Sequence, residues 1–360
     1  MRKLIAAFLV AAGFGSISAC SAEEPKPTAP KEQPAKALGI GDKAPPLKVT
    51  KWVQGEEVKA FAADKVYVVE FWATWCGPCI NAMPHLVELQ KEFEKDIVVI
   101  GMTSKDQNGN NKESVEKFIE KNKAKFTYRF AFSEDRDTDK AYMEAAKQDG
   151  IPCSFVIDKA GKIAFIGHPM ELDLVLPKVV DGSWKGQADV DAIAAANKDL
   201  ETIMEIAEKK PEEALPKLAE FEKKNPIKAK QDMFSVQKMV LMMKAKKYDD
   251  AKVVGQAMLD KSIAKKNAMP GAYTGMILAD KELNPDKKNL DLASKSLDAA
   301  LSFDDKNVGL FLAALELQLT LGDKAKAAEF GKKAEAAADD ENTKKQVAKI
   351  VEMKLKGTEK

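Results

Sequence analysis

The sequence has few of the side chains that bind metal ions through nitrogen or sulfur. Its 360 residues include only two histidines and four cysteines. A structural zinc site needs four such ligands, usually in two close pairs, whereas only Cys76 and Cys79 are separated by two residues. The sequence therefore predicts no metal site.

The chain also lacks an excess of charge of either sign. Its 57 basic residues nearly balance its 56 acidic residues, and no sustained basic face marks a nucleic-acid interface. We therefore expect no nucleic-acid partner. The length suggests two or three domains.

The one apolar run near the N-terminus, residues 4–14, is too short to cross a bilayer comfortably. Arg2 and Lys3 precede it and Ile17-Ser18-Ala19-Cys20 follows, which is the layout of a signal peptide, here residues 1–19. Residues 17–20 resemble a bacterial lipobox, which implies cleavage before Cys20 and lipid on its sulfur. An ordinary secretory signal with a coincidental cysteine is the alternative. We expect an envelope protein, anchored by lipid to a membrane and facing the periplasm or the exterior.

Residues 20–38 consist largely of proline, lysine, glutamate and alanine and have almost nothing to bury. Segments of this composition remain disordered or extended. We predict a tether that holds a soluble body away from the membrane.

The most informative stretch is residues 66–85. An apolar run with several β-branched residues predicts a buried strand, a helical pattern follows, and Cys76 and Cys79 lie at the junction. At a helix N-terminus, unpaired N–H groups and the helix dipole favour a thiolate. A thiolate attacks disulfides, so we expect Cys76 to attack and Cys79 to resolve the mixed disulfide.

The run Phe71-Trp72-Ala73-Thr74-Trp75-Cys76-Gly77-Pro78-Cys79 resembles the active-site motif of the thioredoxin superfamily. It is most similar to the TlpA/ResA-like (redoxin) thiol–disulfide oxidoreductases of the cell envelope. The resemblance implies an α/β thioredoxin-like fold, a central mixed sheet flanked by helices, over residues 39–184. It also implies protein disulfides as substrates, a membrane electron donor, a reducing couple, and no cofactor beyond the Cys76–Cys79 disulfide.

A second stretch, Gly150-Ile151-Pro152-Cys153-Ser154-Phe155-Val156-Ile157-Asp158, resembles the cis-proline loop of that superfamily and the strand after it. The resemblance implies that Ile151 and Pro152 contact the substrate peptide beside the two cysteines. It assigns the same role to the motif residues Trp75, Gly77 and Pro78.

Two further residues each have two interpretations. Glu70 lies inside the apolar strand, where it is either a proton acceptor for the Cys79 thiol or a glutamate paired with a nearby lysine. Cys153 stands where relatives usually have threonine. It is either a third redox thiol or a small, buried and inert filler.

The remaining elements of residues 39–184 follow from periodicity and turn residues. We predict a hairpin around Gln54-Gly55, a strand over 97–102, a polar loop at 108–111 followed by a helix to 125, and a short helix within the acidic segment 131–150. A turn at 159–162 and a final helix over 172–180 complete this part.

Beyond Trp184 the β-branched runs disappear and helical spacing persists to the C-terminus. Residues 185–360 are predicted to be an all-α region with loosely repeated triplets of mostly small residues. The four triplets are Ala214/Leu218/Phe221, Ala251/Gly255/Met258, Ala293/Leu297/Ala300 and Ala327/Gly331/Ala334. The pattern resembles a degenerate tetratricopeptide (TPR-like) array, which implies a surface for a protein partner.

Together these observations predict a membrane-anchored thiol–disulfide oxidoreductase, acting as a reductase of protein disulfides. A redoxin-type peroxidase is one alternative. It requires proline and threonine at positions where this chain has Val69 and Ala73, since Thr74 lies only two residues before Cys76. The other alternative is a non-enzymatic adaptor that binds its partner through the helical region.

Overall fold

The computed structural model describes residues 37–338 and 341–356. The predicted signal peptide, Cys20 and the predicted tether as far as residue 36 lie outside this range. Leu38, at the end of the predicted tether, belongs to the fold, because its N–H donates to the carbonyl oxygen of Ala145 at 2.9 Å.

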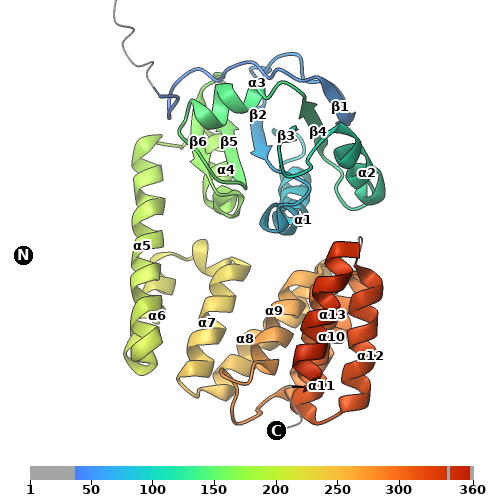
Figure 1. The fold of residues 1–360 in the computed structure, drawn as a ribbon. Helices are drawn as coiled ribbons and strands as arrows, with labels where there is room; N and C mark the ends of the chain where they lie inside the picture. Colours follow the sequence, from blue (N-terminus) through green and yellow to red (C-terminus); the bar gives the residue numbers. More distant parts are fainter. Residues whose placement is uncertain (1–36, 339–340, 357–360) are drawn as a thin grey trace, which may run out of the picture. The chain divides into compact units, whose positions relative to one another are not determined.

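Residues 51–167 form one mixed sheet with the strand order β1-β4-β3-β2-β5-β6 (Figure 1). Its central strand β2 pairs in parallel with β3 and antiparallel with β5. The strands are β1 (Lys51–Gln54), β2 (Val66–Phe71), β3 (Ile97–Ser104), β4 (Arg129–Ser133), β5 (Cys153–Ile157) and β6 (Ile163–Gly167).

Strand β2 is buried along its whole length, because a neighbouring strand pairs with each of its edges and helical elements cover both of its faces. Side chains alternate along a strand, so Val66 and Val68 pack on one face with helices α1, α2 and α4, and Tyr67 and Val69 pack on the other with η1. The helical elements of this part are α1 (Gly77–Glu92), α2 (Lys112–Asn122), α3 (Asp137–Asp139), η1 (Lys140–Glu144), η2 (Pro169–Glu171) and α4 (Leu172–Asp181). This arrangement is the α/β fold that the resemblance implies.

One prediction about local structure is wrong, and one strand was not predicted. The hairpin predicted around Gln54-Gly55 does not form, since β1 pairs with β4 and residues 56–65 form no strand. The segment 129–133, which the sequence analysis did not assign to a strand, forms β4, parallel to β3 and antiparallel to β1. Both differences concern pairing between segments about 80 residues apart along the chain, which local patterns do not encode.

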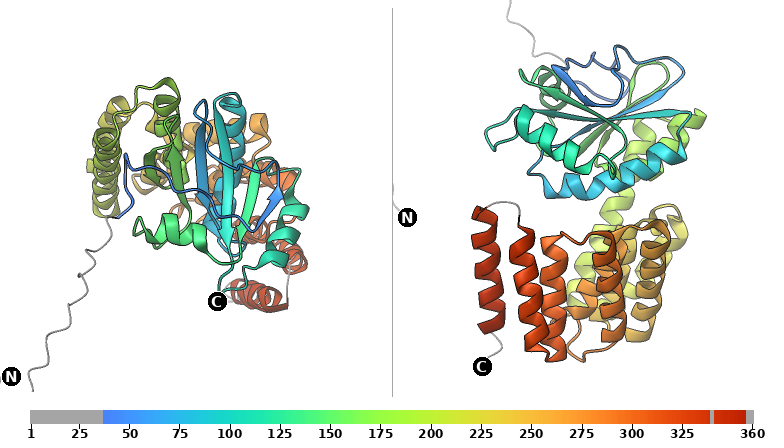
Figure 2. Two further views of the ribbon diagram at one scale, coloured as in Figure 1. Left: turned by 90° about the horizontal axis from the view of Figure 1, so that it is seen from above. Right: turned by 90° about the vertical axis from the view of Figure 1, so that its right-hand side faces the viewer.

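The chain from residue 187 onward is helical throughout its described part. The helices pack on their neighbours in sequence, most closely α9 against α10 and α11 against α12 (Figures 1 and 2). They are α5 (Gln187–Lys209), α6 (Pro211–Lys224), η3 (Lys228–Lys230), α7 (Asp232–Lys244), α8 (Tyr248–Lys265), α9 (Ala268–Ala279), α10 (Leu290–Phe303), α11 (Val308–Leu321), α12 (Lys324–Ala337) and α13 (Glu341–Lys356).

The residues of the four predicted triplets are all buried, one triplet each in α6, α8, α10 and α12. In α6 and α12 the triplet accounts for every buried residue of the helix. Small side chains at these positions let neighbouring helices approach closely, which explains why the spacing recurs. The assignment to the TPR-like class stays a prediction.

Within residues 37–338 and 341–356, no helix combines the length and the apolar character that a membrane span requires.

The close packing of α9 on α10 predicts that Gly275→Ala destabilises the helical region. A Cβ atom at this buried position would lie 2.8 Å from Cδ2 of Leu297 and 3.2 Å from the carbonyl oxygen of Ala293. Overpacking costs about 1–3 kcal/mol, which exceeds the gain of ~1 kcal/mol from the higher helix propensity of alanine. We expect a lower midpoint of thermal unfolding, measured by circular dichroism at 222 nm.

The matched control is Gly309→Ala, an exposed glycine in α11. A Cβ atom there would lie 3.2 Å from the side-chain Oδ1 of Asn307 and would meet no neighbouring helix, so the midpoint of this variant should stay close to that of the wild type. Equal midpoints for the two variants would contradict the packing argument.

Candidate functional site

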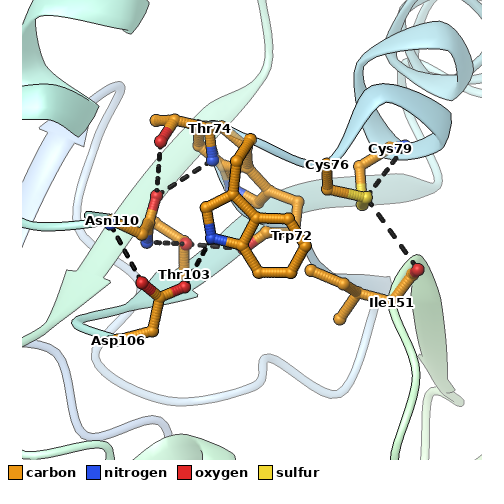
Figure 3. Close-up of a disulfide and its surroundings, with 9 residues drawn as sticks. Trp72, Thr74, Cys76, Cys79, Thr103, Asp106, Asn110 and Ile151 are labelled. Carbon is orange, nitrogen blue, oxygen red and sulfur yellow. Dashed lines mark hydrogen bonds between the residues drawn. A yellow bond between two sulfur atoms is a disulfide. The ribbon is translucent and has the colours of Figure 1, made fainter. Parts of the chain in front are cut away.

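Cys76 and Cys79 form a disulfide at the junction of β2 and α1, with an S–S distance of 2.01 Å (Figure 3). Cys76 is the N-cap of α1, and its Sγ atom accepts a hydrogen bond from the N–H of Cys79 at 3.2 Å. Pro78 lies in the first turn, where proline suits a helix start because no intrahelical N–H bond is lost there. The positive end of α1 therefore points at the sulfur of Cys76, as the sequence predicts.

The predicted substrate-contact residues surround this disulfide. Trp75, Gly77 and Pro78 are exposed, whereas Cys76 is only 3 % exposed. The Ile151–Pro152 peptide bond is cis, as predicted, and the carbonyl oxygen of Ile151 lies 3.9 Å from Sγ of Cys76. The geometry places the two sequence motifs, 75 residues apart along the chain, side by side.

A cavity of about 630 Å³ lies next to the motif residues that precede the disulfide. Trp75 and Ile151 line it, together with the charged side chains of Lys105, Asp106 and Arg136. Its lining is therefore partly apolar and partly charged, and it includes Trp75 and Ile151, to which the sequence assigns substrate contact.

Glu70 is buried in the middle of β2, where it is only 2 % exposed. It alternates with Val69 and Phe71, so its side chain lies on the face of the sheet that α1 covers. One carboxylate oxygen accepts a hydrogen bond from the hydroxyl of Ser154, and the other, Oε1, has no hydrogen-bond partner within residues 37–338 and 341–356. No lysine pairs with Glu70 among the described residues, so the ion-pair interpretation has no support.

Burial raises the pKa of Glu70 to about 8, although the hydrogen bond from Ser154 acts in the opposite direction. At neutral pH this carboxyl group is therefore protonated in most of the molecules. A carboxyl group whose pKa lies close to that of a thiol can exchange a proton with it efficiently. Glu70 thus has the ionisation behaviour that a proton carrier for Cys79 needs.

Cys153 lies next to Phe71 in the register of β5 on β2 and packs in the cluster on the opposite face of the sheet from Cys76 and Cys79. It is a free, buried cysteine. Burial raises the pKa of its thiol to about 12, and the nearby Glu70 carboxylate acts in the same direction. A protonated thiol that faces away from the disulfide favours the filler interpretation.

The loop between β3 and α2 adds residues that the sequence analysis described only as polar. Trp75 Nε1 donates to Oδ2 of Asp106 at 2.6 Å, and the N–H of Thr74 donates to Oδ1 of Asn110 at 2.9 Å (Figure 3). A run of asparagine and glycine is a typical loop signal, so nothing in the local pattern distinguishes Asn110 from its neighbours.

His85 follows Pro84 within α1 and faces α4. Its Nε2 atom is 3.4 Å from Oδ1 of Asp173 in α4. Across the described ranges, no group of three or more histidine, cysteine, aspartate or glutamate side chains could hold a metal ion.

The buried carboxyl group predicts that the stability of the wild type falls with pH in a way that the stability of Glu70→Gln does not. Between pH 4.5 and about 8 the unfolded chain releases the Glu70 proton while the folded chain keeps it, so the wild type loses stability as pH rises. Relative to wild type, the variant should gain on the order of a few kcal/mol from pH 4.5 to pH 8. Urea unfolding of the disulfide form at several pH values measures this.

The control is Glu57→Gln, at an exposed position. Its difference from the wild type should not change with pH. A constant difference for Glu70→Gln as well would show that Glu70 ionises normally in the folded protein.

Comparison with known proteins agrees with this geometry. The model of the AhpC/TSA family matches residues 40–166. Protein FixW of Rhizobium leguminosarum is 34% identical over 155 residues, which cover 42% of this chain and 70% of the relative. The thiol-disulfide oxidoreductase ResA of Geobacillus kaustophilus is 32% identical over 127 residues, covering 35% and 68%.

Among solved structures, a thiol-disulfide isomerase from Corynebacterium glutamicum matches with a TM-score of 0.33 and 24% identity, covering 38% of this chain and 96% of that one. All these matches fall short of half of this chain, and the family model ends before the helical region. The geometry of the site, together with the identity and coverage of these relatives, shows that the chain belongs to the thioredoxin-like AhpC/TSA family and is a thiol–disulfide oxidoreductase.

Proposed function

We propose that this protein is a membrane-anchored reductase of protein disulfides in the cell envelope. The observation that carries the proposal is the Cys76–Cys79 disulfide at the start of α1, with its Sγ atom beside the carbonyl oxygen of Ile151. A carbonyl oxygen next to a reactive sulfur can accept a backbone hydrogen bond from an extended peptide. This arrangement suits a substrate whose disulfide is held in a polypeptide.

In the proposed reaction the reduced protein supplies two electrons. The Cys76 thiolate attacks one sulfur of the substrate disulfide, and the other substrate sulfur leaves as a thiolate and takes a proton. The ionised form of Glu70 accepts the proton of Cys79, and the Cys79 thiolate attacks the Cys76 sulfur of the mixed disulfide. The second substrate sulfur leaves as a thiolate and takes a proton, and the Cys76–Cys79 disulfide forms. A membrane electron donor then returns the disulfide to the dithiol.

This proposal predicts that Cys76→Ser and Cys79→Ser each abolish the reduction of insulin disulfides. With dithiothreitol as the reductant, the rate should fall to that of dithiothreitol alone. Cys79→Ser should in addition accumulate a mixed disulfide with the substrate, because the resolving thiol is missing. Turbidity and non-reducing gels measure the two effects.

Cys153→Ala is the control, since it removes a cysteine from the other face of the sheet and should leave the rate unchanged. The reduction potential of the couple decides its direction. A value near about −270 mV indicates a reductant, and one near about −120 mV indicates an oxidant and contradicts the proposal.

The family model leaves a peroxidase as the second candidate. Val69 and Ala73 occupy the positions where that chemistry requires proline and threonine, and the hydroxyl of Thr74 is held by Asn110 at 2.9 Å. Rapid consumption of hydrogen peroxide that persists in Cys79→Ser, without insulin reduction by the wild type, would favour the peroxidase.

We further propose that the helical region binds a protein partner, as its repeated close packing suggests. In the adaptor alternative this binding is the whole function. Biological activity that survives in the double variant Cys76→Ser/Cys79→Ser would favour the adaptor over the enzyme.

The anchor rests on the lipobox resemblance, and we infer that Cys20 carries lipid and holds the protein at an envelope membrane. Cys20→Ser should then move the protein from the membrane fraction to the soluble fraction, because the remaining chain has no second lipid attachment in this proposal. Fractionation and immunoblotting measure this. Cys153→Ser serves as the control, and membrane retention of Cys20→Ser would contradict the anchor.

A further inference from the structure

Asn110 lies at the end of the loop between β3 and α2 and is completely buried. Its side-chain amide makes four hydrogen bonds, which is about as many as an asparagine side chain can form. A buried amide that is fully satisfied in this way holds the groups around it in one arrangement.

Two of these bonds go to the residue two positions before the reactive cysteine. Oδ1 of Asn110 accepts from both the N–H and the hydroxyl of Thr74, each at 2.9 Å. The other two bonds go to strand β3, because Nδ2 donates to Oγ1 of Thr103 at 2.9 Å and to the carbonyl oxygen of Ser104 at 2.6 Å. The backbone partners fix the amide orientation, since an N–H only donates and a carbonyl only accepts.

Further bonds extend this connection on both sides. Thr103 donates through Oγ1 to the carbonyl oxygen of Trp72, so β3 also holds the end of β2. Asp106 accepts from the N–H of Asn110 through Oδ1 and from Trp75 Nε1 through Oδ2, at 3.0 and 2.6 Å. Residues 72, 74 and 75 are thus each held by one cluster, the Asn110 cluster, formed by Thr103, Asp106 and Asn110 (Figure 3).

We propose that Asn110 is a positioning residue for Cys76, fixing through Thr74 and Trp75 the turn that aims the reactive sulfur along helix α1. This inference rests on the proposed function, because it concerns the same reactive sulfur. Asn110 makes no hydrogen bond to either cysteine. It acts only through the residues that precede them.

The turn before α1 shows how the effect reaches the sulfur. The N–H of Cys76 donates to the carbonyl oxygen of Ala73 at 3.0 Å, which closes a tight turn over the residues that the cluster holds. The Sγ atom then lies in line with the N–H of Cys79. When the turn loosens, Sγ samples positions away from this N–H, and the thiolate loses part of its stabilisation.

The test compares three variants of the purified, reduced protein. Asn110→Ala removes the cluster's central amide. Thr74→Val removes one donor to Asn110 while keeping the backbone bond and the side-chain shape, so it covers the case in which Asn110→Ala fails to fold. Asn111→Ala is the matched control: its side chain caps α2 by accepting from Ser114, and it makes no bond to Thr74 or Trp75.

We measure the rate of Cys76 alkylation by iodoacetamide from pH 5 to 9 and the equilibrium with glutathione. In Asn110→Ala we expect alkylation at pH 6 to be about 3–10-fold slower and the pH profile to move upward, since one pKa unit is tenfold in thiolate. The reduced form is then less stabilised, so the potential becomes more negative, by about 30 mV for a tenfold change. Thr74→Val should shift the alkylation profile and the reduction potential in the same directions, but by smaller amounts.

Asn111→Ala should lower the unfolding midpoint but leave the alkylation profile and the potential as in the wild type. If Asn110→Ala and Thr74→Val fold and show the wild-type profile, Asn110 supports the fold only and the inference is overturned. These measurements need no protein substrate. A wild type that fails to reduce insulin therefore counts against the proposed function and not against the role of Asn110.

Discussion

The site depends on the hydrogen bond from the N–H of Cys79 to Sγ of Cys76. It joins the first turn of α1 to the sulfur and, with the dipole of a 16-residue helix, makes that sulfur the favoured place for negative charge. The sheet positions the residues that make this contact. Strand β2 is fixed on both sides by β3 and β5, so it delivers Cys76 to one position relative to the cis-proline loop that precedes β5.

The same central strand places a second ionisable group on the same face of the sheet. In the part of the chain that the structure describes, Glu70 has no charged partner, and burial keeps it largely protonated near neutral pH. A protonated Glu70 adds no negative charge behind Cys76, so the helix dipole is not opposed when the thiolate forms. Burial of a glutamate costs free energy, but here it gives two acidic groups different roles: the Cys76 thiol ionises, and the Glu70 carboxyl group keeps its proton.

Features carried by consecutive residues were predictable. The Cys76–Cys79 pair, the cis bond before Pro152 and the small buried residues of the helical region each occupy a short, recognisable pattern. Features that depend on distant pairing were not. The register of β5 on β2 puts Cys153 on the opposite face from the disulfide, and the pairing of β1 with β4 replaces the expected hairpin. Asn110 became visible only when folding brought it to Thr74.

The difference between the predictable and the unpredictable features has a physical basis, because the site contains reactive groups and groups that hold them in place. The reactive groups must have particular chemistry, so their residue types are restricted and the sequence reveals them. The groups that hold them are common polar side chains such as asparagine, which also occur in polar loops for other reasons, so their residue type alone does not reveal them. Asn110 satisfies two donors of Thr74 and two acceptors on β3 with one amide, which neither an aspartate nor a serine can do. Its identity is therefore fixed by the geometry of four partners.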